Sequence, residues 1–181
     1  EETVGLATSG AVAGLCPITE SNLGDGIFNG TEFLAAGGTF GVGSDSNIRI
    51  SLSEELRTLE YSQRLRDISR NLLVHGEGSV GHALYTGAAR GGAQAIGRNA
   101  GTIAVGTLAD FTAIDTNHTY LCALSEHQLF DGFCFASDDT VVTDVWSAGR
   151  HVVQSGRHIH RDAILDRFRA AMSDLKSKIN E

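Results

Sequence analysis

The stretch that decides the fold is Thr39-Phe-Gly-Val-Gly-Ser-Asp-Ser-Asn47. A short apolar run with glycines ends at Asp45, and a polar loop and a long helical pattern follow it. In a (β/α)8 barrel the chemistry lies at the C-terminal ends of the parallel strands, where a carboxylate needs a partner such as a metal ion. The alternative is an aspartate that caps a helix or closes an Asx turn. The pattern alone leaves both interpretations open.

The residues before this stretch predict a repeat of strands and helices. Ala11-Val-Ala-Gly-Leu-Cys-Pro17 is another short apolar segment, and a proline stops it. Ser21-Asn-Leu-Gly-Asp-Gly26 is rich in turn-forming residues and predicts a loop. Thr31-Glu-Phe-Leu-Ala-Ala-Gly-Gly38 predicts a short helix that ends in a glycine cap. Alternation of this kind indicates parallel strands in an α/β fold.

Three of these motifs together resemble a known enzyme superfamily. Cys16-Pro17, the loop from Ser21 to Gly26 and Gly43-Ser-Asp-Ser46 resemble the end of the barrel in the amidohydrolase superfamily. The continuation from Ser44 to Asp67 is more specific and is similar to the formimidoylglutamate deiminases. The resemblance covers essentially the whole chain. It implies an α/β fold made of the C-terminal part of a metal-dependent (β/α)8 barrel, with its last two strands and their helices, plus part of a small β-sandwich domain.

The resemblance also implies that part of the enzyme is absent from this chain. Members of the family are more than twice as long as 181 residues. Their His-x-His pair lies on the first barrel strand, another metal-binding histidine on the fifth and a catalytic histidine on the sixth. We therefore expect this chain to be the C-terminal portion of a longer enzyme, with the missing N-terminal half as its necessary partner and little activity of its own.

Site roles follow from the same resemblance. Asp45 would be both a metal ligand and the catalytic proton shuttle, and the cofactor would be one divalent metal ion, most simply Zn²⁺. Water activated by the metal would attack the amidine carbon of N-formimino-L-glutamate, a small acidic substrate, and release N-formyl-L-glutamate and ammonia. Ser46, Asn47 and Asn22, together with Ser21, lie where substrate contacts could form, although a turn role is equally open for each.

Other functions are compatible with the same residues. A related amidohydrolase that acts on a purine, a pterin or imidazolonepropionate would share Asp45 and the small sandwich. A non-catalytic structural fragment belongs to a different class. Ammonia release from each candidate substrate separates the enzymes, and metal content of the chain alone tests the fragment, because zinc sites use three or four protein ligands.

The chain divides by composition into five segments. Residues 1–100 are expected to form the barrel part, and residues 101–118 to carry one strand of the sandwich. Residues 119–138 predict a helical segment packed on the barrel, residues 139–160 a sandwich hairpin that turns at Ala148-Gly-Arg150, and residues 161–181 a C-terminal amphipathic helix.

The composition limits the kinds of partner that we expect for this chain. The formal net charge of −8 argues against nucleic acid as a default partner, and no apolar run approaches the length of a membrane span. Cys16, Cys122 and Cys134 have no metal-type spacing, and we expect reduced, buried thiols in a cytoplasmic protein. The family resemblance adds the expectation of a homodimer.

The helix expected after Asp45 carries apolar residues on two faces. Ser51 and Glu54 form a capping-box pattern at its start. The two faces indicate either a bend near Glu60 or a single helix packed on both sides. The arginines of this segment are expected to be solvated or to pair with Glu54, Glu60 and Asp67; they are Arg57, Arg64, Arg66 and Arg70.

Two further sequence patterns give weaker indications of a functional site. The small residues between His82 and Gly97 predict a helix that lies close to its neighbours, since no Lys-Ser/Thr pair follows to make a phosphate loop. His158-Ile-His160 would point both rings to one side on a strand, as zinc requires. It leads into a helix without a third ligand in register, so we do not favour a metal site there.

Overall fold

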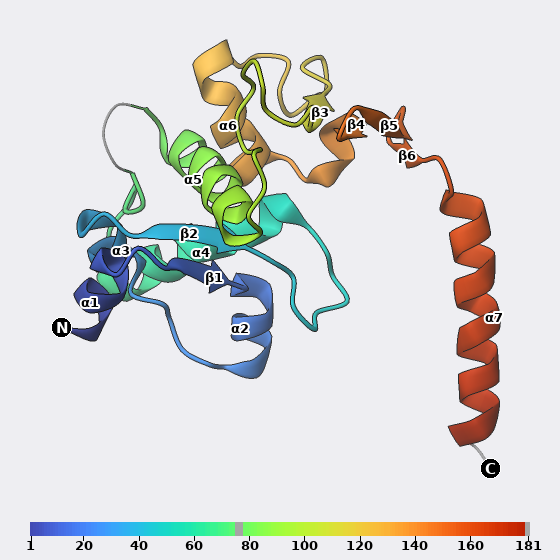
Figure 1. Ribbon diagram of the computed structural model, residues 1–181, viewed down its shortest axis with the longest axis horizontal. Helices are drawn as coiled ribbons and strands as arrows, with labels where there is room; N and C mark the ends of the chain where they lie inside the picture. The colour runs from blue at the N-terminus through green and yellow to red at the C-terminus, as the bar shows by residue number, and fades with distance from the viewer. Residues whose placement is uncertain (75–77, 180–181) are drawn as a thin grey trace.

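Figure 1 shows a computed structural model of the chain, which describes residues 1–74 and 78–179. The first part of the chain is built from helices around two strands. Its elements are α1 (Glu2–Thr8), β1 (Val12–Leu15), α2 (Pro17–Leu23), α3 (Gly30–Ala35), β2 (Thr39–Val42), α4 (Leu52–Asp67) and α5 (Val80–Ala95).

The second part contains short helical turns and an antiparallel sheet. Its elements are β3 (Phe111–Ile114), η1 (Glu126–Gln128), α6 (Leu129–Asp131), η2 (Gly132–Ala136), η3 (Asp139–Val141), β4 (Val142–Ser147), β5 (Arg150–Gln154) and β6 (Arg157–His158). The last helix, α7 (Arg161–Ile179), follows; residues 180 and 181 of the predicted C-terminal segment lie outside the described residues.

The two strands of the first part confirm the predicted parallel arrangement. β1 and β2 pair in parallel, with Val12 opposite Thr39 and Leu15 opposite Val42. The Gly43 N–H donates to the Leu15 carbonyl at 3.0 Å, so the pairing continues one step beyond the strands. A parallel pair needs a crossover connection, and α2 and α3 supply it.

The loop predicted from Ser21 to Gly26 is confirmed for residues 24–26 and is wrong for residues 21–23. Residues 21–23 belong to α2, and the chain leaves the helix only at Gly24, whose φ of 76° provides the left-handed cap. Pro17 occupies the first helical position, where its fixed φ favours a helix. The Glu20 carboxylate accepts the Cys16 N–H at 2.6 Å and satisfies a donor at the helix start. These local caps outweigh the turn-forming composition of the segment.

Helix α5 lies against the two strands because its small residues permit a close approach (Figure 1). A Cβ atom added at Gly91 would overlap the Phe40 carbonyl of β2, and one added at Gly87 would lie 2.8 Å from the Phe40 ring. The predicted tightly packed helix is therefore confirmed, and Gly91 is the point of closest contact.

This contact predicts opposite effects for two adjacent glycines. Gly91→Ala forces helix and strand apart and is expected to lower the free energy of unfolding of the chain by about 1–3 kcal/mol. Gly92→Ala meets nothing within 4 Å and is expected to be neutral or to stabilise by up to about 1 kcal/mol through helix propensity. Denaturant titration of both variants checks this, and equal effects would contradict the packing argument.

Helix α4 is continuous, so of the two predicted alternatives the bend near Glu60 does not occur and the segment is a single helix. Ser51 caps its start by accepting the Glu54 N–H at 3.2 Å, and Ile68 ends it in the left-handed region with a φ of 49°. Leu56 and Leu59 are buried on one face, whereas Leu65 and Ile68 on the other are exposed. The two predicted faces exist, but only the first is covered within the described residues.

The run from η1 to η2 packs on α4 and α5. Asp131 accepts the Gly81 N–H at 2.7 Å, and the Tyr61 and Phe135 rings stack with centroids 5.8 Å apart. Arg57 donates to the carbonyls of Cys134, at 2.7 Å, and Ser137. The prediction for Arg57 is thus wrong, because its guanidinium bonds to backbone carbonyls of two buried residues of this run and not to a carboxylate on its own helix.

Two of the other ion pairs predicted for α4 are confirmed, and one carboxylate has a different partner. Arg64 pairs with Glu60 at 2.7 Å and Arg66 with Asp67 at 2.6 Å, as predicted. Glu54 pairs instead with Arg49 of the preceding loop.

The second part forms a four-stranded antiparallel sheet in the order β3-β4-β5-β6. β4 and β5 form the hairpin that was expected at Ala148-Gly-Arg150, and Gly149 adopts a φ of 79° in its turn. β6 ends at His158, so His160 lies in a turn. The His-x-His pair therefore lacks the strand geometry on which its metal-binding interpretation depended.

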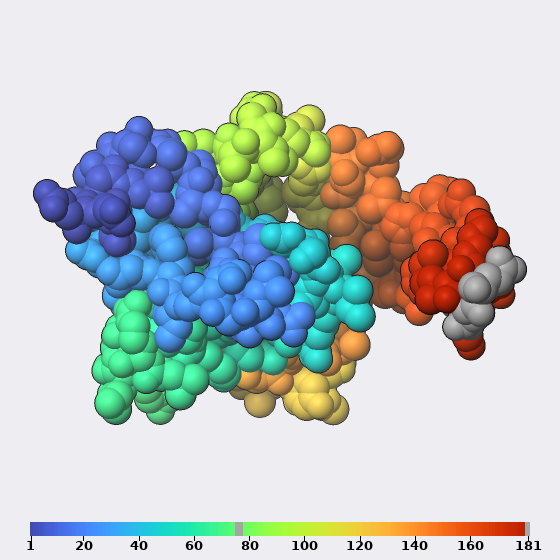
Figure 2. All heavy atoms as spheres, turned by 90° about the horizontal axis from the view of Figure 1, so that it is seen from below, coloured from blue at the N-terminus to red at the C-terminus, as the bar shows by residue number. Residues whose placement is uncertain are grey.

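Helix α7 projects away from the rest of the chain (Figures 1 and 2). Its apolar stripe is exposed along its whole described length and consists of Ile164, Phe168, Met172, Leu175 and Ile179. Of the helices that the structure describes, none has both the length and the apolar character that a membrane crossing requires.

Candidate metal and catalytic site

The candidate site lies where β1 and β2 end. α2 begins two residues after β1, and the loop that carries Asp45 follows β2 directly. Because the strands are parallel, both segments emerge at the same edge of the sheet. This edge is the place where α/β folds with parallel strands hold their ligands.

Asp45 has an unusual backbone and a free side chain. Its φ is 48°, in the left-handed region that few residues other than glycine adopt. Its carboxylate is exposed, and within residues 1–74 and 78–179 no hydrogen bond or ion pair reaches it. Ser51, six positions later, caps α4. The capping interpretation of Asp45 is therefore wrong, and the carboxylate remains available for a ligand.

The backbone in front of Asp45 is held by two hydrogen bonds. The Ser44 carbonyl accepts the Thr19 hydroxyl of α2 at 2.8 Å and the Asn47 N–H at 3.1 Å. Thr19 is buried. One hydrogen bond closes the turn locally, and the other ties the turn to the neighbouring strand connection.

Two of the three residues predicted for substrate binding lie in the turn that carries Asp45, and the third lies on α2. Ser46 follows Asp45 and is exposed, and Asn22 is exposed in the last turn of α2. The Asn47 side chain accepts the Arg49 N–H at 2.8 Å and so has a role in the turn. Ser21 donates to the Pro17 carbonyl at 2.7 Å within α2. Their contacts with a substrate remain a prediction.

The surroundings of the site are acidic. Burial, and then the negative charges of Asp45, Glu20 and Glu55, raise the pKa of the Cys16 thiol. A protonated thiol is a poor nucleophile, so Cys16 offers no covalent route. Three carboxylates that act on one thiol make this edge favourable for a cation.

The cysteines are only partly as predicted. All three are free thiols, but Cys122 is exposed and Cys16 is half-buried. Cys134 alone is fully buried, and burial raises its pKa to about 12.

Glu55 is the least expected group near the site. It lies in the first turn of α4, is only 3% exposed, and accepts the Ile18 N–H at 2.9 Å through one oxygen. The other oxygen is buried without a partner among the described residues. Burial, with smaller additions from Glu20 and Glu54, raises the pKa of Glu55, although the Ile18 N–H opposes this.

The raised pKa of Glu55 predicts a pH dependence of stability. The folded chain binds the Glu55 proton more tightly than the unfolded chain does. Protonated Glu55 therefore makes its full contribution to the free energy of unfolding below the unfolded pKa of about 4.3, and this contribution is lost as the pH rises through the folded pKa. The difference in free energy of unfolding between wild type and Glu55→Gln should therefore decline as the pH rises from about 4. Gln keeps an acceptor for the Ile18 N–H. Denaturant titrations over this range measure the slope, and a rising difference would refute the assignment.

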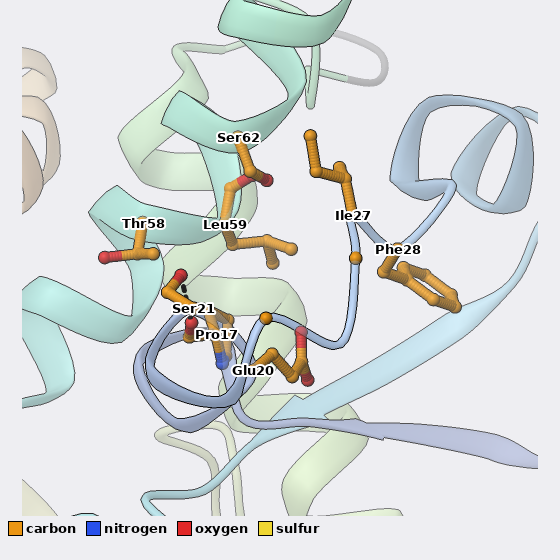
Figure 3. Close-up of a pocket in the computed structure, with 10 residues that line it drawn as sticks. Pro17, Glu20, Ser21, Ile27, Phe28, Thr58, Leu59 and Ser62 are labelled. Carbon is orange, nitrogen blue, oxygen red and sulfur yellow. Dashed lines mark hydrogen bonds between the residues drawn. The ribbon is translucent and has the colours of Figure 1, made fainter.

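A hollow of about 240 Å³ lies between α2, the loop after it and α4 (Figure 3). Its polar lining comes from Glu20, Ser21, Thr58 and Ser62, and its apolar lining includes Ile27 and Leu59. Asp45 and the three predicted substrate residues are not part of this lining. The hollow is thus separate from the edge where Asp45 lies.

Comparison with known proteins now defines the family. Residues 2–152 match the Amidohydrolase family. The chain belongs to the amidohydrolase family. A formimidoylglutamate deiminase from Pseudomonas aeruginosa is 47% identical over 175 residues, which are 96% of this chain and 39% of that protein.

Solved structures agree with this amidohydrolase fold. An amidohydrolase from Brucella melitensis superposes with a TM-score of 0.88 at 47% identity, over 96% of this chain and 38% of that one. An adenosine deaminase from Xanthomonas campestris, solved with bound zinc, superposes with a TM-score of 0.84 at 22% identity, over 97% of this chain and 40% of that one. The chain thus spans less than half of the relatives it matches, and the predicted partial barrel is confirmed.

At this edge, the amidohydrolase chain offers one side chain that fits the role of a metal ligand. The Asp45 carboxylate is exposed and has no hydrogen bond or ion pair among the described residues, and Glu20 and Glu55 act with it on the same Cys16 thiol. In the part of the chain that the structure describes, no group of three or more His, Cys, Asp or Glu residues is arranged to hold a metal ion. A zinc site needs three or four protein ligands, so Asp45 fits as one member of a set whose other members lie elsewhere.

Sequence reasoning missed two residues that shape the amidohydrolase site. Thr19 and Glu55 form hydrogen bonds with groups 25 and 37 residues away, and no local sequence pattern indicates such partners. The one available signal for Glu55 is its place beside Leu56 and Leu59 on the buried face of α4. An acid on such a face implies a specific partner.

Proposed function

We propose that this chain is the C-terminal part of a formimidoylglutamate deiminase, a metal-dependent hydrolase that converts N-formimino-L-glutamate and water into N-formyl-L-glutamate and ammonia. The observation that carries the proposal is the free Asp45 carboxylate at the C-terminal edge of two parallel strands. The 47% identity to the deiminase from Pseudomonas aeruginosa supports the substrate.

Asp45 has two roles in this proposal. It is one ligand of a divalent metal, which we take to be zinc and which lowers the pKa of water when bound. The Asp45 carboxylate would accept one proton of the attacking water and pass it to the departing nitrogen of the amidine. The same nitrogen would take a second proton from the new hydroxyl group as the C=O bond forms and the C–N bond breaks, so both protons of the water leave with the nitrogen as ammonia. Ser46, Asn47 and Asn22 would contact the substrate from the same edge.

The remaining ligands would come from an N-terminal half of the enzyme, which is the partner that the proposal requires. We also propose a homodimer in the cytoplasm. The free thiols of the described residues are compatible with a reducing compartment.

The substrate is tested by ammonia release from the complete enzyme. N-formimino-L-glutamate is expected to give ammonia and an equal amount of N-formyl-L-glutamate, which mass spectrometry identifies. Adenosine, guanine and a pterin serve as competing substrates for ammonia release, the first because the adenosine deaminase shares the fold. Imidazolonepropionate is tested by its consumption, because hydrolysis opens its ring and releases no ammonia. Faster turnover of any of these would replace the proposed substrate. Inactivity with all of them, in enzyme that contains zinc, would favour a non-catalytic role.

A further inference from the structure

We propose that Thr19 is a positioning residue for Asp45, and this inference rests on the proposed role of Asp45 as a metal ligand. The Thr19 hydroxyl holds the Ser44 carbonyl at 2.8 Å. The Ser44–Asp45 peptide is one of the two planes that define φ of Asp45. Fixing that peptide therefore fixes the direction in which the Asp45 carboxylate leaves the backbone.

The Thr19 bond is one of two that hold the Ser44 carbonyl. The Asn47 N–H closes the turn locally, whereas the Thr19 hydroxyl ties the turn to α2. Asp45 has a φ of 48°, in a region that costs free energy for most residues other than glycine, so its surroundings help to hold it there. Loss of the Thr19 bond therefore lets the turn move relative to α2.

Thr19 itself is placed on a rigid support. Pro17 restricts the backbone at the start of α2, and the Ile18 N–H donates to the buried Glu55 carboxylate of α4 at 2.9 Å. α4, α2 and the Asp45 turn are thus connected by hydrogen bonds through buried groups. A hydroxyl held this firmly can impose a geometry on the turn.

The test compares Thr19→Val, which replaces the hydroxyl with a methyl group, with Thr19→Ser, which keeps the hydroxyl. In the complete zinc enzyme, Thr19→Val is expected to lower both kcat and the affinity for zinc by about 10–100-fold, as is usual for groups that orient a metal ligand. KM should change little, and Thr19→Ser should restore most of both quantities. Zinc affinity is measured by competition with a chromophoric chelator, independently of turnover.

A matched control is available on α5. The Thr86 hydroxyl donates to the His82 carbonyl at 2.7 Å, and this bond lies outside the site. Thr86→Val should leave kcat and zinc affinity unchanged. Thr19→Ala, which introduces no added bulk, carries the same expectation as Thr19→Val if the latter fails to fold.

The inference would be overturned if a folded Thr19→Val or Thr19→Ala protein kept the zinc affinity and kcat of the wild type. It would also be overturned if Thr19→Ser lost as much zinc affinity and kcat as Thr19→Val. The failure of the proposed function looks different. If wild-type enzyme binds zinc but releases no ammonia from N-formimino-L-glutamate, the substrate is wrong, while the zinc affinities of the variants still decide the role of Thr19.

Discussion

Asp45→Asn in the complete enzyme is expected to abolish measurable turnover of N-formimino-L-glutamate and to leave the fold intact. The amide is a weaker metal ligand than the carboxylate and cannot accept the proton of the attacking water. Loss of a group that is both ligand and proton shuttle should cost at least about a thousandfold in kcat. Steady-state ammonia release measures the rate, and circular dichroism monitors the fold.

The control for this substitution is Asp166→Asn. Asp166 is exposed on α7 and lies far along the chain from the site. The same change of charge there should leave the rate unchanged. Turnover at the wild-type level in Asp45→Asn would remove Asp45 from the mechanism.

Glu60→Ala is expected to give the largest loss of stability, about 3–5 kcal/mol in the free energy of unfolding. The Glu60 side chain is fully buried and satisfies three donors. They are Arg64 at 2.7 Å, the Leu72 N–H at 3.1 Å and the Leu73 N–H at 2.9 Å. Alanine leaves a guanidinium, a half-buried amide and a buried amide without their acceptor, and an unsatisfied buried donor costs its full desolvation free energy.

Glu54→Ala is the matched control on the same helix. Glu54 pairs with Arg49 near the surface, where ion pairs contribute about 0–1 kcal/mol. Denaturant titration of both variants compares the two costs. A loss below about 1 kcal/mol for Glu60→Ala would show that the donors find other partners.

The fold was predictable where the signal is local. The apolar runs that end at Cys16 and Gly43 predicted parallel strands, and the small residues of α5 predicted a close contact that Gly91 makes with Phe40. Ser51 was recognisable as a cap because its partner is three residues away. Each of these features depends on the spacing of residues along the chain, which can be read directly from the sequence.

Prediction failed where distant partners decide the structure. Arg57 bonds to a carbonyl 77 residues away, and Glu60 supports amides 12 and 13 residues away across the end of its own helix. The start of α2 does not follow from the turn-forming residues of the segment, because Pro17 and the Glu20 carboxylate stabilise a helix there.

The candidate site shows the same division. The place of Asp45 at the end of a strand followed from pattern, but its left-handed backbone and the bond from Thr19 to Ser44 did not. Both depend on how two strand connections meet in space.

The most direct measurement is anomalous diffraction at the zinc absorption edge from crystals of the complete enzyme. A zinc peak about 2.0–2.2 Å from one carboxylate oxygen of Asp45 is the predicted result. A fully occupied zinc ion whose ligands do not include Asp45 would contradict the central claim that this aspartate binds the catalytic metal.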